Sequence, residues 1–264
     1  IDVEFEKVFY FDNIFLEIKK LRDMISKASN IVAFTGAGVS AESGIPTYRG
    51  AGGVWHNYNP DKYANVNYFF KDPSYYWNFY KDVRHSILKD AAPNQSHIHL
   101  AEMEKQGRLK TIITQNVDGL HQQAGSCNVL ELHGNTRSFS CQSCGLSYDL
   151  DQTHALLEKE LPPVCTSCRG LLKPDVVMFG EALPRRLLEK ARHEAAGCDL
   201  FLAIGSSLLV QPAASLPIMA KKSGAAFVII NKDQTRLDAK ADLVISGNAS
   251  EILKMAVNGL DKAG

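Results

Sequence analysis

The most informative segment of the chain is residues 30–41, which read NIVAFTGAGVSA. Residues 30–35 are mostly apolar, as in a parallel strand buried on both faces, and the glycines after them indicate a tight turn. The turn, Gly36-Ala37-Gly38-Val39-Ser40-Ala41, fits the pattern G-x-G-x-x-G/A, whose backbone N–H groups can bind a pyrophosphate. A turn without a ligand would use the same glycines, so the pattern alone leaves both interpretations open.

Apolar runs of the same kind recur along the chain and alternate with stretches of helical character. The runs are residues 109–114, 129–132, 200–205, 225–230 and 241–245, and the helical stretches are 96–106, 184–196, 213–222 and 250–257. Near the N-terminus, apolar residues at helical spacing indicate a further helix capped by Asp12 or Asn13. This alternation predicts an α/β fold with a doubly wound, Rossmann-like parallel sheet.

Two stretches interrupt the alternation. Residues 49–95 are rich in turns and aromatic side chains, most of which we expect to form a small satellite core, and residues 137–175 hold four of the six cysteines. We expect both to be insertions that form a smaller zinc-ribbon and helical module. The predicted organisation is a Rossmann-like domain in three parts, 1–48, 96–136 and 176–264, with a helical insertion at 49–95 and a zinc ribbon at 137–175.

The four clustered cysteines form two C-x-x-C pairs. Cys141 and Cys144 are followed, after 20 residues, by Cys165 and Cys168, a spacing typical of a zinc ribbon. Four thiolates fill a tetrahedral site and leave no position for water, so the zinc is expected to be structural. Cys127 and Cys198 have no partner at ligand spacing.

Charge and hydropathy exclude several other classes of protein. The chain has 264 residues, with 29 Lys and Arg against 29 Asp and Glu, so it has no net charge to hold duplex nucleic acid. No apolar run approaches the roughly 20 residues that cross a bilayer, and the first residues are too acidic for a signal peptide. We expect a soluble cytoplasmic protein without membrane or nucleic-acid partners, or a mitochondrial one if a leader was removed.

Polar side chains follow three of the predicted strands. Gln115, Asn116 and Asp118 come after residues 109–114, Gly205-Ser206-Ser207 after 200–204, and Asn231 after 225–230. Each could be an ordinary capped turn, but open α/β sheets bind ligands at the carboxyl ends of their strands. A dehydrogenase is disfavoured, because the segment about 20 residues after the glycine turn is a glycine-rich loop, not a strand that ends in Asp or Glu.

His133 lies between the run 129–132 and the cysteine segment, at the predicted junction of sheet and insertion. A single histidine can be structural or exposed. A position in a cleft between modules, however, makes this imidazole a candidate general base.

Taken together, these motifs resemble the sirtuins, the NAD-dependent protein-lysine deacylases. The resemblance covers about residues 30–250 and rests on motifs in the same order: residues 36–46, Thr114-Gln115-Asn116-Val117-Asp118, His133-Gly134, both C-x-x-C pairs, Phe179-Gly180-Glu181 and Gly205-Ser206-Ser207. It implies a cleft between the two modules that takes NAD from one side and an acyl-lysine peptide from the other.

The resemblance also implies roles for individual residues. The turn from Gly36 to Ser43, including Glu42, would hold the pyrophosphate, and Arg49 with the loop to Trp55 would close over the cofactor. Gln115 and Asn116 would contact the nicotinamide-side ribose, and Asp118 the carboxamide. The adenosine half would face Gly205, Ser206, Ser207, Asn231 and Ala249.

The reaction that the resemblance implies consumes NAD. His133 would take a proton from a ribose hydroxyl, so that the acyl group ends on ADP-ribose and nicotinamide and free lysine are released. Residues 176–180, with Val177 and Phe179, and residues 207–210 would flank the peptide as edge strands. The alternatives are ADP-ribosyl transfer to a protein from the same site and a non-catalytic NAD sensor.

The acyl group is less defined. Members that prefer succinyl or malonyl lysine carry Tyr-x-x-Arg on the helix of the acyl pocket, and here Tyr80 is followed by Val83 at that place and by Arg84 one position later. Since i+3 and i+4 both neighbour position i on a helix, Arg84 could still reach an acyl carboxylate beside the small Ala64. This favours an acidic acyl group, and acetyl is the alternative.

Overall fold

The computed structural model describes residues 2–50, 52–85 and 90–258, and its centre is a parallel sheet of six strands. The order is β3-β2-β1-β7-β8-β9, as predicted for a doubly wound sheet. The strands are β1 (Ile31–Thr35), β2 (Leu109–Thr114), β3 (Val129–Glu131), β7 (Leu200–Ile204), β8 (Ala226–Asn231) and β9 (Leu243–Ser246). The strand order reverses between β1 and β7, so the crevice of the fold opens there.

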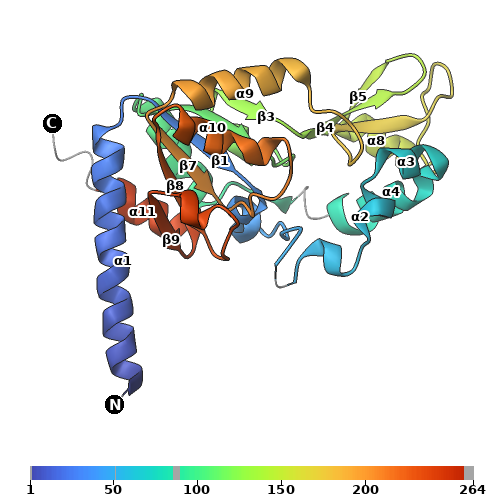
Figure 1. Ribbon diagram of the computed structural model, residues 1–264. Coiled ribbons are helices and arrows are strands. Elements are labelled where there is room, and N and C mark those ends of the chain that lie inside the picture. The colour runs from blue at the N-terminus through green and yellow to red at the C-terminus, as the bar shows by residue number, and fades with distance from the viewer. Residues whose placement is uncertain (1, 51, 86–89, 259–264) are drawn as a thin grey trace.

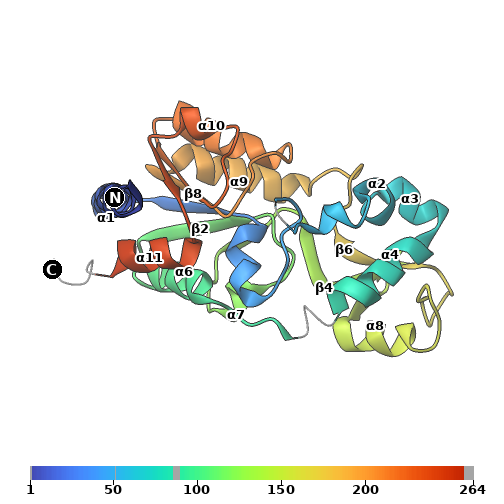
Figure 2. The ribbon, with the colours of Figure 1, turned by 90° about the horizontal axis from the view of Figure 1, so that it is seen from below.

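Helices cover both faces of this sheet. Figures 1 and 2 show α1 (Asp2–Lys27), α6 (Gln95–Lys105) and α11 (Ala249–Val257) on one face, with α9 (Arg185–Gly197) and α10 (Leu216–Lys222) on the other. Each layer encloses its own apolar core, because β1 and its neighbours are buried on both sides. The helix capped by Asp12 or Asn13 was predicted too short, since α1 already begins at Asp2.

The two insertions lie together at the end of the sheet away from α1 (Figures 1 and 2). The zinc ribbon is an antiparallel sheet of β4 (Gly134–Cys141), β5 (Ser147–Asp149) and β6 (Leu172–Val176), with α8 (Leu150–Leu157) beside it. The helical insertion packs on it through a shared core, in which Trp77 stacks on Phe139 at 5.9 Å between ring centroids. The smaller module expected from the sequence is therefore one packed unit.

The helical insertion is built from short helices whose ends are capped by side chains. They are α2 (Pro60–Tyr63), α3 (Val66–Lys71), α4 (Pro73–Phe79) and a π-helical segment over Tyr80–His85. The side chain of Asn59 accepts from the Asp61 N–H at 2.9 Å, and Asp72 likewise caps α4. Helices of four to seven residues are too short to show periodicity, which explains why the sequence predicts a helical insertion at 49–95 but not the bounds of its helices.

Within the described residues, no helix combines the length and the apolar character that crossing a bilayer requires.

Candidate active site

A cavity of about 1270 Å³ opens at the carboxyl ends of the central strands, between the sheet and the inserted module. The predicted site residues that line it are Gly36, Ala37, Gly38, Ala41, Glu42, Arg49, Trp55, Gln115, Asn116, His133, Val177, Phe179, Gly205, Ser206, Ser207, Asn231 and Ala249. Ser40, Asp118 and Tyr80 do not line it, and the side chain of Arg84 lies outside the described residues.

The glycines after β1 are required by close packing against the end of β7. A Cβ on Gly36 would lie 2.7 Å from the Gly205 carbonyl oxygen, and one on Gly38 would lie 2.8 Å from the Gly205 Cα. The Gly36 N–H donates to Ile204 and the Gly38 N–H to Gly205, so these two groups are already engaged. The N–H of Ala37, which opens a short 3-10 helix, has no acceptor among the described residues and remains for a ligand.

A buried polar network supports the turn from behind the cavity wall. The Ser40 hydroxyl donates to the Asp118 carboxylate at 2.7 Å and accepts from the Asn116 amide at 3.1 Å. Asn116 also donates to the Gly36 carbonyl at 3.1 Å, while the second Asp118 oxygen accepts from the Leu120 N–H. Ser40 and Asp118 therefore hold Asn116 and the glycine turn in register. Their direct contact with a cofactor stays a prediction.

Two histidines in this network were not singled out by the sequence. His97 lies 3.3 Å from the Ser40 hydroxyl, and the His121 ring packs on that of His97. Burial lowers the pKa of His97 from 6.5 to about 4 and that of His121 to about 3, so both are neutral at physiological pH. For His97 the signal was the spacing from Asn94, because the two form a capping box at the start of α6.

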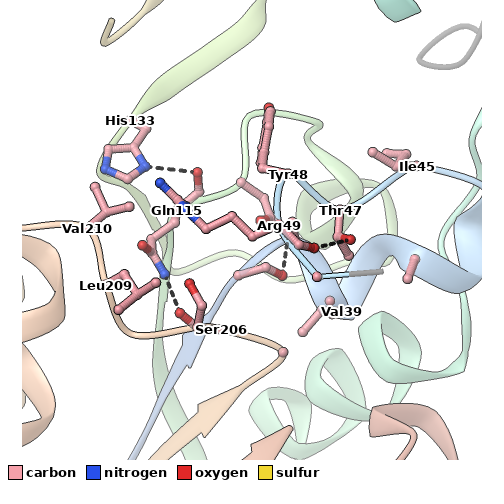
Figure 3. Close-up of a pocket in the computed structure, with 18 of the residues that line it drawn as sticks. Val39, Ile45, Thr47, Tyr48, Arg49, Gln115, His133, Ser206, Leu209 and Val210 are labelled. Atoms are coloured by element: carbon pink, nitrogen blue, oxygen red, sulfur yellow. Dashed lines mark hydrogen bonds between the residues drawn. The ribbon is translucent and has the colours of Figure 1, made fainter. Parts of the chain in front are cut away.

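His133 is held so that one ring nitrogen faces the cavity without a proton. Its Nδ1 lies 3.1 Å from the Gln115 carbonyl oxygen, which can only accept, so Nδ1 carries the hydrogen (Figure 3). The neutral ring then has a lone pair on Nε2. Burial lowers the pKa of His133 below 6.5, partly offset by the bond to Gln115, so the ring is ready to accept a proton.

The residue after His133 is a glycine for a steric reason. Gly134 has φ +74°, and a Cβ there would lie 1.9 Å from the Asp175 carbonyl oxygen on β6. Only glycine allows β4 to leave the sheet at this angle and cross β6 so closely. Gly134 thus fixes the backbone next to the His133 imidazole at the junction of the two modules.

The loop after β1 covers the cavity from the side of the helical insertion. The Thr47 hydroxyl donates to the Arg49 carbonyl at 2.8 Å, and His56 donates to the Gly50 carbonyl at 2.9 Å. In Figure 3 the Arg49 side chain extends from this loop across the cavity, where Gln115 donates to Ser206 at 2.8 Å. Gly50, in the same loop, lies close to the Asp233 side chain.

An aromatic wall separates the cavity from the helical insertion. Trp55 stacks on Tyr48 at 5.1 Å and on Phe79 at 6.3 Å, and its ring is tilted against Phe179 at 6.5 Å. Ala64 lines the cavity next to this wall, as the sequence predicted. Tyr80 instead is fully buried, with its hydroxyl 3.0 Å from His154 Nε2 of the zinc ribbon.

The segment expected to act as an edge strand for a peptide is tied to the chain through its N–H groups. Val177 donates to the His133 carbonyl at 2.8 Å, Met178 to the Glu181 carboxylate at 2.7 Å, and Phe179 to the Ala64 carbonyl at 2.8 Å. A peptide at this segment therefore cannot use these three N–H groups. It would pair with the carbonyl of Val177 or with the facing segment, residues 207–210.

The four paired cysteines converge as a metal site requires. Their sulfur atoms all lie within 4.8 Å of one another, with 3.5 Å between Cys141 and Cys168 and 3.6 Å between Cys144 and Cys165. Tetrahedral Zn–S bonds of about 2.3 Å place sulfurs about 3.8 Å apart, so the set fits zinc. The Tyr148 hydroxyl lies 3.1 Å from the Cys165 sulfur and lowers the pKa of that thiol to about 6, which favours the thiolate.

Comparisons with known proteins agree with this geometry. Residues 36–212 match the Sir2 family. NAD-dependent protein deacylase 2 of Archaeoglobus fulgidus is 44% identical over 242 residues, which cover 91% of this chain and 95% of that protein. An NAD-dependent protein deacetylase of Sulfolobus acidocaldarius is 49% identical over 230 residues, 87% of this chain and 89% of the relative.

Solved structures give the same result. One from a study of the mechanism and regulation of Sir2 enzymes has a TM-score of 0.88 and 42% identity, and covers 94% of this chain and 99% of its own. Another, of Sir2 with a deacetylated p53 peptide and 3'-O-acetyl ADP ribose, also has a TM-score of 0.88, with 34% identity and coverage of 93% and 98%. The matching sequence, sheet order and cysteine cluster together establish that the chain belongs to the Sir2 family.

Proposed function

We propose that this chain removes acyl groups from protein lysines and consumes NAD, giving nicotinamide, O-acyl-ADP-ribose and free lysine. The observation that carries the proposal is the His133 imidazole, which lines the same cavity as the glycine turn after β1 and keeps Nε2 unprotonated because Nδ1 donates to Gln115. Related proteins with 44% and 49% identity are named for this activity. A single cavity that holds a phosphate-binding turn and a general base supports the same reaction.

The proposed chemistry of the protein is proton transfer and positioning. NAD, when bound, supplies the ribose hydroxyl that becomes the acyl acceptor and the nicotinamide that leaves. His133 Nε2 accepts the proton of that hydroxyl, while the Gln115 carbonyl keeps the second hydrogen on Nδ1. A neutral imidazole is required for this step, and burial of the ring favours the neutral form.

The cradle for NAD is assigned on the same basis. The turn from Gly36 to Ser43 with Glu42 would bind the pyrophosphate, since much of this turn lines the cavity and the Ala37 N–H has no acceptor in the described chain. Arg49 and Trp55 would cover the cofactor. The remaining assignments are Gln115 and Asn116 for the ribose, Asp118 for the carboxamide, and Gly205, Ser206, Ser207, Asn231 and Ala249 for the adenosine half.

The acyl group is the finer part of the proposal. An acidic acyl group, succinyl or malonyl, requires a cation at the end of the acyl pocket, and Arg84 is the candidate. The sequence places Arg84 four positions after Tyr80, and this spacing is the basis for assigning it to an acyl carboxylate. The contact between Tyr80 and His154 weakens the role of that tyrosine, so the acidic specificity rests on the arginine.

Arg84→Met tests the acyl group. If Arg84 binds an acyl carboxylate, activity on a succinyl-lysine peptide should fall by roughly 2 kcal/mol, about 30-fold, while activity on the matched acetyl-lysine peptide stays within twofold. Lys81→Met, on the same segment, is the control. Equal effects on both peptides, or none on either, would refute acidic specificity and leave acetyl as the substrate group.

The reaction itself is tested by product mass. The wild-type protein, incubated with NAD and an acyl-lysine peptide, should give nicotinamide, acyl-ADP-ribose and a peptide whose mass is lower by that of the acyl group. His133→Ala should reduce this turnover by about 10²-fold or more while NAD binding persists. An ADP-ribosylated protein in place of acyl-ADP-ribose would instead identify a transferase, and near-normal turnover of the variant would remove His133 as the base.

A further inference from the structure

Lys173 is unusual among the charged residues of this chain. Of the Lys, Arg, Asp and Glu side chains that the structure describes, it is the buried one, with 6% of its surface exposed. It lies on β6 of the zinc ribbon and takes no part in the chemistry assigned above. A buried ammonium group is costly unless every N–H finds an acceptor, so its partners indicate its purpose.

All three partners of Lys173 come from the chain that follows it. Nζ donates to the Val176 carbonyl at 2.9 Å and to the Pro174 carbonyl at 3.4 Å, and it forms an ion pair with the Glu181 carboxylate at 3.1 Å. The same Glu181 oxygen accepts from the Met178 N–H at 2.7 Å. Residues 176–181 are therefore folded around one ion pair, whose lysine is buried and whose glutamate is half-buried.

This folded segment forms part of the cavity wall. Val177, Met178, Phe179 and Glu181 all line the cavity, and Phe179 exposes 38% of its surface. The segment has two other attachments, one to the His133 carbonyl through Val177 and one to Ala64 and Val66 through Phe179. The ion pair is the third attachment, and it is the one that belongs to the zinc ribbon.

The strand register connects this attachment to the metal site. In the pairing of β4 with β6, Lys173 lies opposite Ser140 and Leu172 lies opposite Cys141, a zinc ligand. Asp175, two residues after Lys173, accepts from the Ser140 hydroxyl at 2.7 Å and fastens β6 to β4 a second time. The position of Lys173 Nζ is thus fixed by the same strand pair that carries the cysteine.

We propose that the Lys173–Glu181 ion pair is a clasp that sets the position of residues 177–180 against the incoming acyl-lysine peptide, and that the zinc ribbon acts on substrate binding through it. The inference rests on the proposed deacylase function and deepens it. Lys173 and Glu181 are positioning residues, since they act through the backbone of Val177 to Phe179. Without the ammonium group, Glu181 loses its counter-ion and two carbonyls lose their donor, so the segment loses one of its three attachments and its position between the other two is no longer fixed.

The test is a double-mutant cycle read out by peptide binding. Lys173→Met, Glu181→Gln and the double variant are compared for the affinity of a fluorescein-labelled acetyl-lysine peptide, measured by anisotropy, and for KM of peptide and of NAD. Each single variant should weaken peptide binding by about tenfold, and the double variant by about the same factor, because the clasp is lost once. KM for NAD and zinc content should stay close to the wild-type values, while Tm falls in the single variants because one partner of the ion pair is left unpaired.

Two controls separate this inference from the proposed function and from general destabilisation. Lys221→Met breaks an exposed ion pair with Asp242 and should leave peptide affinity unchanged. A wild-type protein that does not deacylate the peptide refutes the proposed function. An active wild-type protein whose variants keep normal peptide affinity, show additive losses, or lose NAD and peptide affinity equally refutes the clasp. If Lys173→Met fails to fold, the clasp is tested by comparing Glu181→Gln with Lys173→Arg. Glu181→Gln should weaken peptide binding, and Lys173→Arg, which keeps the positive charge, should not.

Discussion

Replacing Gly134 with Ala should destabilise the fold and displace the proposed base, His133, and a second glycine provides a matched control. Gly134 has φ +74° and its Cβ would lie 1.9 Å from the Asp175 carbonyl oxygen, whereas Gly107 has φ +73° and its Cβ would meet nothing within 4 Å. The two substitutions therefore impose the same backbone strain. They differ in the collision with β6.

The structure sets the size of both effects. A non-glycine residue at this φ costs about 1–2 kcal/mol, which should apply to Gly107→Ala and Gly134→Ala alike. To reach an ordinary contact of about 3.4 Å, the Asp175 carbonyl would have to move by about 1.5 Å in Gly134→Ala, and overpacking of this kind costs a further 1–3 kcal/mol or more. At roughly 2–4 °C per kcal/mol, Gly107→Ala should lower Tm by a few degrees and Gly134→Ala by about 10 °C.

Catalysis should separate the two variants more strongly than stability does. Gly134 follows His133 directly, and the His133 carbonyl also accepts from Val177, so a displaced β4 should move the proposed base and the proposed peptide-binding segment together. Misplacement by about 1 Å can cost on the order of 10²-fold in rate. We expect Gly134→Ala to lose 10- to 100-fold in kcat/KM at a temperature well below its Tm, and Gly107→Ala to stay within twofold.

Thermal denaturation followed by circular dichroism and an assay of nicotinamide release measure both quantities. Equal Tm shifts in the two variants would mean that β6 yields without cost, and the steric explanation of the His-Gly pair would be wrong. A large Tm shift with unchanged kcat/KM would show that the base is positioned independently of β4.

Three further predictions concern protonation and zinc. Because burial holds the pKa of His133 below 6.5, titration of this group should not change kcat/KM above pH 6.5 and should lower it only at more acidic pH. A fall in kcat/KM that begins above pH 6.5 as the pH is lowered would contradict a buried neutral base. The free energy of unfolding should fall as the pH drops from 6.5 to about 4, by roughly 3 kcal/mol from His97 alone, since the unfolded chain then binds a proton that the folded protein excludes; urea unfolding at pH 7 and pH 4 measures it, and a His97→Gln variant with the same pH dependence would refute the assignment. Removing zinc with a chelator should unfold the cysteine module and abolish activity, and active protein with well under one zinc per chain would contradict a structural site.

The sheet could be predicted from the sequence because its signals are local. Each of the six strands is a short apolar run, and their alternation with helices leaves few topologies for a parallel sheet. The four zinc ligands were equally accessible, because C-x-x-C spacing encodes the geometry of half a site within four residues. In both cases the sequence signal lies within one short segment of the chain.

The contacts that shape the cavity could not be predicted in this way, because their partners are distant in the sequence. The glycine pattern predicts that the N–H groups of Gly36 and Gly38 bind a phosphate. In the structure these N–H groups donate to the carbonyls of Ile204 and Gly205. The sequence around Gly36 does not predict that the turn at Gly205, 169 positions later, packs against it. The burial of Lys173 and its ion pair with Glu181 could not be predicted for a similar reason, since they depend on how β6 packs on β4.

Tyr80 shows a different limit of sequence reasoning. Its neighbours were assigned from α-helical spacing, but the chain from Tyr80 to His85 is a π-helical segment, which rotates successive side chains differently. The tyrosine also faces a second module, where His154 supplies its partner. Helical periodicity alone places a side chain relative to its own helix and says nothing about which neighbouring module the helix turns it toward.

The arrangement of the cavity implies that cofactor binding and acyl choice depend on different parts of the chain. The strand order reverses between β1 and β7, so the ends of these strands form a rigid floor whose glycine contacts cannot change without moving the sheet. The helical insertion and residues 177–180 form the opposite wall, and they are held by caps, aromatic stacking and single hydrogen bonds. Substitutions in the wall, such as Ala64→Val, should therefore alter acyl preference while NAD affinity persists, whereas substitutions at Gly36, Gly38 or Gly205 should weaken NAD binding for every acyl substrate alike.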